Sequence, residues 1–118
     1  MDILLALSPL DVGQGAVVAG GLCLGIETLQ GTDALLRFVA ETPEHLQRGA
    51  GGVLVKAPKR GQDLRVDMPA VGPDTVRNAA RAGLDGIVVS AGKVVLIDRD
   101  ATRAALEETG LFLFARVL

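Results

Sequence analysis

Short apolar runs alternate with segments of helical periodicity along this chain, and this alternation restricts the possible folds more than any other feature. Residues 16–27 (AVVAGGLCLGIE) hold two such runs on either side of a glycine pair, a pattern typical of a β-hairpin. GVLVK (52–56) and LFLFARV (111–117) are each predicted to be a single strand. GIVVSAGKVVLID (86–98) repeats the hairpin pattern, and we predict a second hairpin there.

The segment TDALLRFVAET (32–42) is predicted to be the first helix. Thr32 suits the N-cap, and Asp33 suits the first turn, where the helix dipole favours negative charge. The apolar residues that should face the core recur at helical spacing and are Leu35, Leu36, Phe38 and Val39.

Two more helices are predicted further along the chain. PDTVRNAARA (73–82) begins with a proline and is followed by a glycine, as helices often are. ATRAALEET (101–109) can be capped by Asp98 or Asp100 and is followed by Gly110. The predicted order of elements is therefore ββαβαββαβ.

This order predicts an α/β (α+β) fold, in which a single mixed sheet carries helices packed on it. A length of 118 residues is close to that of one common domain, so we expect one domain over residues 1–118. Aromatic residues make up only 3% of the chain, so its core must be built from Val, Leu, Ile and Ala.

Composition and motifs exclude several classes of function. The net charge of −2 and the scarcity of aromatic rings disfavour binding to nucleic acid. A single cysteine cannot form an internal disulfide, so the cytoplasm is the expected compartment. The opening MDILLALSPLDV lacks the basic start of a signal peptide and is too short to span a bilayer. P-loop, GxGxxG, HExxH and paired CxxC motifs are absent from the sequence.

The segment KAPKRGQDLRVDMPAVGPDT (56–75) concentrates charge between a predicted strand and a predicted helix. Its cationic side chains Lys56, Lys59, Arg60 and Arg65 could meet phosphate oxygens. Asp63 and Asp67 would project to the same side if the backbone between them is extended. Carboxylates beside cations suit a site where Mg²⁺ or Mn²⁺ assists phosphate chemistry.

Each of these features has a simpler explanation that the residues alone leave open. The charged segment could be a solvated loop whose opposite charges pair with little effect on stability. Glu27 and Asp33 flank a glycine turn, and Thr32 with Asp33 could serve only to cap a helix. DVGQG (11–15) could be an ordinary turn.

Four blocks of the sequence, in order and spacing, resemble the C-terminal domain of the LpxI family, the UDP-2,3-diacylglucosamine pyrophosphatases of lipid A biosynthesis. The blocks are DVGQGAVV, ETLQGTDALLR, GGVLVKAPKRGQDLRVDMPAVGPDT and AGLDGIVVSAGKVVLIDRD. The resemblance extends from about Leu10 to Leu118. It implies that residues 1–9 form the junction to a separate N-terminal domain.

The resemblance implies a Mg²⁺-dependent hydrolase of lipopolysaccharide synthesis in Gram-negative bacteria. It would cleave UDP-2,3-diacylglucosamine into UMP and 2,3-diacylglucosamine 1-phosphate (lipid X). The family builds its active site between two domains, so we expect the isolated domain to be inactive or nearly so. We also expect a homodimer, for which exchange of segments would be a simple route, and at most peripheral contact with the inner membrane.

The residues of the family motifs can be carried over one by one. The Q-D-x-R-x-D block falls on Gln62, Asp63, Arg65 and Asp67, and the family's preceding lysine falls on Lys56. The G-T-D block falls on Thr32 and Asp33, and D-V-G-Q falls on Asp11 and Gln14. Where the family commonly has an acidic residue before G-T-D, this chain has Gln30, which would leave one negative ligand fewer.

The motif positions give an expected site. The expected metal ligands are Asp63, Asp67 and Asp33, although Asp63 or Asp67 could instead orient water. Lys56 and Arg65 would offset the developing charge. The expected substrate contacts are Gln62, Thr32, Asp11, Gln14 and Lys59.

Two other classes of function remain open at this point. One is a non-catalytic module that binds an anion through Lys56, Lys59 and Arg65. The other is an oligomerisation domain whose sheet edge pairs with a partner.

Overall fold

The computed structural model describes residues 15–19, 22–28, 30–41, 51–57, 70–92 and 94–116. The strands are β1 (Gly15–Ala19), β2 (Leu22–Ile26), β3 (Val53–Lys56), β4 (Ala70–Val71), β5 (Gly86–Ser90), β6 (Val95–Leu96) and β7 (Phe112–Arg116). The helices are α2 (Thr32–Ala40), α3 (Pro73–Arg81) and α4 (Arg99–Thr109). The predicted α/β class is confirmed, and the observed order differs from the predicted one by the short strand β4.

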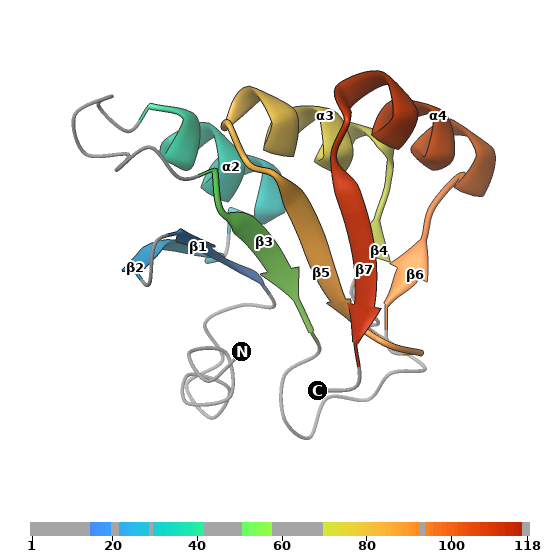
Figure 1. Ribbon diagram of the computed structural model, residues 1–118. Coiled ribbons are helices and arrows are strands. Elements are labelled where there is room, and N and C mark those ends of the chain that lie inside the picture. The colour runs from blue at the N-terminus through green and yellow to red at the C-terminus, as the bar shows by residue number, and fades with distance from the viewer. Residues whose placement is uncertain are drawn as a thin grey trace.

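The main sheet has five strands in the order β2-β1-β3-β5-β7 (Figure 1). β1 pairs antiparallel with β2 and with β3, whereas β3, β5 and β7 pair in parallel. Because β1 is antiparallel to both of its neighbours, β2 runs parallel to β3, and so also to β5 and β7. The carboxyl ends of these four strands therefore share one edge of the sheet.

All three helices lie on one face of this sheet, with α3 between α2 and α4 (Figure 1). The core fills the space between the two layers, where Leu36 of α2, Leu54 of β3 and Ile87 of β5 are fully buried. These are branched aliphatic residues, as the scarcity of aromatic rings predicts.

The predicted helices are confirmed, but two details of α2 are wrong. The N-cap is Gly31, with φ 92°, and Thr32 is the first helical residue. Phe38 is 65% exposed, so only Leu35, Leu36 and Val39 form the buried face. In α4, by contrast, Asp98 is the N-cap and accepts from the Ala101 amide, as predicted.

The second predicted hairpin is wrong. β6 pairs in parallel with β4, where Ala70 lies opposite Val95 and Val71 opposite Leu96. The physical reason lies in the position of β5, which has β3 on one side and β7 on the other. Both of its edges are occupied, so the chain after Ser90 has to leave the sheet.

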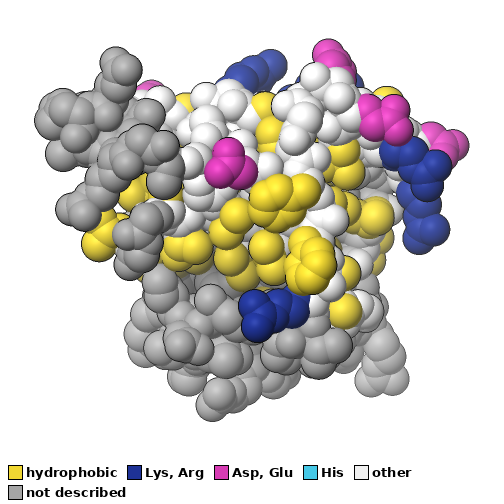
Figure 2. All heavy atoms as spheres, viewed as in Figure 1, with side chains coloured by type: hydrophobic (Ala, Val, Ile, Leu, Met, Phe, Trp, Pro, Cys, Tyr) yellow, Lys and Arg dark blue, Asp and Glu magenta, His cyan; other side chains and the backbone are white. Residues whose placement is uncertain are grey.

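The face of the sheet opposite the helices is also apolar. Ala16, Val55 and Ala57 form a buried cluster there, and the outward residues of β7, Phe112 and Phe114, are 47% and 56% exposed. Figure 2 shows hydrophobic side chains gathered over this part of the sheet. Among the described segments, no helix has both the length and the apolar character needed to cross a bilayer.

Candidate functional site

A group of polar side chains lies where β2 and β3 end and α2 begins. Glu27 follows β2 directly, Lys56 is the last residue of β3, and Thr32 opens α2. The Glu27 amide donates to the Gly15 carbonyl at 2.8 Å, which fixes the end of β2 against the start of β1. In open sheets with parallel strands, ligands commonly bind at the carboxyl edge, so the position is suited to a site.

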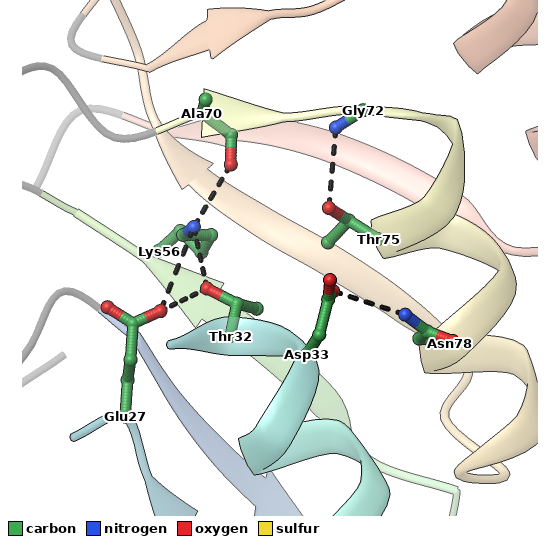
Figure 3. A network of polar contacts seen from close by, with 8 residues as sticks. All are labelled: Glu27, Thr32, Asp33, Lys56, Ala70, Gly72, Thr75 and Asn78. Atoms are coloured by element: carbon green, nitrogen blue, oxygen red, sulfur yellow. Dashed lines mark hydrogen bonds and ion pairs between the residues drawn. The ribbon is translucent and has the colours of Figure 1, made fainter. Parts of the chain in front are cut away.

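The Lys56 ammonium is the centre of this group (Figure 3). It donates to the Thr32 hydroxyl at 2.9 Å and to the Ala70 carbonyl at 3.0 Å, and it lies 3.9 Å from Glu27 Oε1. The Thr32 hydroxyl in turn donates to Glu27 Oε1. Lys56 and Glu27 are only 5% and 8% exposed, so this is a buried ion pair bridged by a hydroxyl.

Burial lowers the pKa of Lys56 below its usual value, because the charged ammonium loses hydration. The negative charges of Glu27 and Asp33 act in the opposite direction and favour the protonated form. Asp33 follows Thr32 at the start of α2, and Figure 3 shows both residues beside the Lys56 side chain.

Asp33 lies in the first turn of α2, but its side chain caps no amide of that helix. Its Oδ1 instead accepts from Asn78 Nδ2 of α3 at 3.1 Å (Figure 3). Asn78 Oδ1 accepts from Arg81 at 3.1 Å, which fixes the direction of the amide. Since Thr32 is also engaged elsewhere, the capping explanation for these two residues is wrong.

Of the site residues predicted from the sequence, the structure describes Thr32, Asp33 and Lys56, and it brings these three together. The others lie outside the described residues and are Asp11, Gln14, Lys59, Gln62, Asp63, Arg65 and Asp67. Asn78 was missed, and no local signal marks it, because it is 45 residues from Asp33.

Within the charged segment, residues 58–69 are bracketed by described residues on both sides. Lys56 and Ala57 precede them, Ala70 follows them, and the Lys56 ammonium donates to the Ala70 carbonyl. Lys56 and Ala70, on either side of this stretch, are therefore held together beside Thr32.

A divalent metal ion fits this arrangement only if the charged segment contributes. In the described part of the chain, no three His, Cys, Asp or Glu residues are grouped closely enough to hold an ion. Asp33 offers an exposed carboxylate, while Glu27 is engaged with Thr32 and Lys56. Oxygen donors suit Mg²⁺, and Asp63 and Asp67, the further carboxylates predicted from the sequence, lie between the bracketing residues along the chain.

Comparison with known proteins shows the family of the chain. Residues 1–114 match the family described as LpxI C-terminal domain. The UDP-2,3-diacylglucosamine pyrophosphatase LpxI of Caulobacter vibrioides is 50% identical over 115 residues. That match covers 95% of this chain but 41% of the relative, so the chain spans about two fifths of the relative's length.

Proposed function

Because this chain belongs to the LpxI C-terminal domain family, we propose that it is the catalytic domain of a two-domain pyrophosphatase acting on UDP-2,3-diacylglucosamine. The products would be UMP and lipid X, in lipid A biosynthesis. The observation that supports this proposal is the buried Lys56 ammonium, which is held by Thr32, Glu27 and the Ala70 carbonyl. Such a cation at the carboxyl edge suits the negative charge of a diphosphate.

In the proposed site, Asp33, Asp63 and Asp67 would hold Mg²⁺, which would supply Lewis acidity for phosphoryl chemistry. Lys56 and Arg65 place positive charge where the leaving phosphate gains negative charge. Asp63 or Asp67 orients the attacking water. Thr32, Gln62, Lys59, Asp11 and Gln14 contact the remainder of the nucleotide sugar.

The other partners of the whole protein are also proposals. The remaining length of the relative leaves room for a second domain, and we propose that it completes the substrate pocket. The 118-residue chain by itself is then expected to release little UMP. We further propose a homodimer and peripheral contact with the inner membrane.

The function is tested by removing the metal from the two-domain protein. We expect release of UMP and lipid X in Mg²⁺, a fall to background in EDTA, and recovery when Mg²⁺ or Mn²⁺ returns, because the carboxylates need the ion. Calorimetry with UMP tests the rival anion-binding module, which should bind through its cations without metal. Metal-independent binding without hydrolysis would contradict the proposed enzyme.

Asn78 provides a second test, since it orients the proposed ligand Asp33. We expect Asn78→Ala to raise the Mg²⁺ concentration for half-maximal activity about tenfold, with most activity regained at saturation. Arg77→Ala, an exposed change on the same helix, serves as the control and should leave the requirement unchanged. An unchanged requirement in Asn78→Ala would count against Asp33 as a ligand.

A further inference from the structure

Glu27 is a buried carboxylate to which the family motifs give no role. It is 8% exposed, and its backbone amide is fixed by the Gly15 carbonyl at 2.8 Å. A carboxylate removed from water is costly unless it is hydrogen-bonded and paired. Its Oε1 meets both needs, because it accepts from the Thr32 hydroxyl and faces the Lys56 ammonium at 3.9 Å.

The direction of these hydrogen bonds is determined by the groups involved. The Thr32 hydroxyl carries one hydrogen, which it donates to Glu27. Its oxygen is then left to accept from Lys56, as the 2.9 Å contact shows. One carboxylate therefore sets the orientation of the hydroxyl and compensates the charge of the ammonium.

We propose that Glu27 is a positioning residue, which holds the Lys56 ammonium, directly and through the Thr32 hydroxyl, in the geometry that meets the substrate's diphosphate. This inference rests on the proposed function, since it assigns Thr32 and Lys56 to the substrate. Glu27 itself acts through these two side chains (Figure 3).

The kinetic test uses two variants of the two-domain protein. Glu27→Gln keeps the shape of the side chain and an acceptor oxygen but removes the charge, and Thr32→Val removes the hydroxyl. We expect each to lower kcat about tenfold to a hundredfold, the range for losing a hydrogen bond to a charged group. KM should change less than about threefold, because the interaction is used mainly in the transition state.

Three further variants separate positioning from a general structural role. The double variant should have a kcat no lower than that of the less active single variant, because both changes break one network. Thr32→Ser should recover most of the lost kcat, since it restores the hydroxyl. Glu41→Gln makes the same chemical change at an exposed position at the end of α2 and should match the wild type.

A second measurement needs no substrate and uses the chain as it is. In ¹⁵N-labelled protein, a buried and hydrogen-bonded ammonium exchanges its protons slowly. Of the chain's three lysines, we expect Lys56 to give such a signal, identified by its loss in Lys56→Met. Glu27→Gln should abolish or broaden the signal, whereas Glu41→Gln should not.

The two measurements distinguish this inference from the proposed function. If the wild type hydrolyses nothing, the proposed function fails, and the Lys56 signal alone decides whether Glu27 positions the ammonium. A folded Glu27→Gln variant with wild-type kcat overturns the inference, whether the signal changes or not. If Glu27→Gln does not fold, Thr32→Val decides the kinetic test, and a wild-type kcat there overturns the inference equally.

Discussion

Asp63→Ala and Asp67→Ala, made separately in the two-domain protein, are each expected to lower kcat about a hundredfold to a thousandfold. The physical reason is that each change removes a carboxylate proposed to hold the metal or to orient water at the phosphoryl group. The measurement is the rate of UMP and lipid X release at saturating Mg²⁺.

The matched control is Asp100→Ala, an exposed aspartate in the first turn of α4. It should retain wild-type kcat, with only a small loss of stability from the helix dipole. Circular dichroism of all three variants checks that the fold is intact. Wild-type turnover in both site variants would remove the basis for the proposed active site.

Gly52→Ala is expected to lower the free energy of unfolding by about 2–5 kcal/mol, because backbone strain and overpacking act together. Gly52 has φ 85°, a conformation that costs an alanine about 1–2 kcal/mol. A Cβ there would lie 2.5 Å from the Val18 carbonyl oxygen and 2.5 Å from the Ala19 Cβ. Since these atoms belong to the neighbouring strand β1, overpacking adds about 1–3 kcal/mol.

Gly92→Ala separates the two contributions. Gly92 has φ 72°, but a Cβ there would meet no atom within 4 Å. Urea unfolding followed by circular dichroism should therefore show a loss of about 1–2 kcal/mol for Gly92→Ala and about 2–5 kcal/mol for Gly52→Ala. Equal losses in the two variants would show that β1 moves to accommodate the methyl group.

The elements predicted correctly from the sequence are those with local signals. The β1–β2 hairpin has a glycine pair in the sequence between its two strands, α3 has its proline, and α4 has Asp98 and Gly110 at its ends. The pairing of β6 could not be predicted in this way. It depends on β7, formed later in the chain, which occupies the edge of β5.

The site was predictable only in part, for a related reason. Charge density and the family motifs identify Lys56, Thr32 and Asp33 as functional residues. They do not show that Glu27 pairs with Lys56, because that contact requires β1 to lie between β2 and β3 in the sheet. A helical pattern likewise could not show that Phe38 is exposed, since helical spacing alone does not fix where the buried face ends.

The hydrogen bond from the Lys56 ammonium to the Ala70 carbonyl joins residues 14 positions apart. It therefore fixes the distance between the two residues that bound the intervening segment. Residues inserted between these two points would not need to shift β3 or β4. The entropy of closing a loop also grows slowly, by only about 0.6 kcal/mol for each doubling of its length. Changes of length within this span but outside residues 62–67 are therefore expected to cost little stability, so long as the lysine and its three partners are retained.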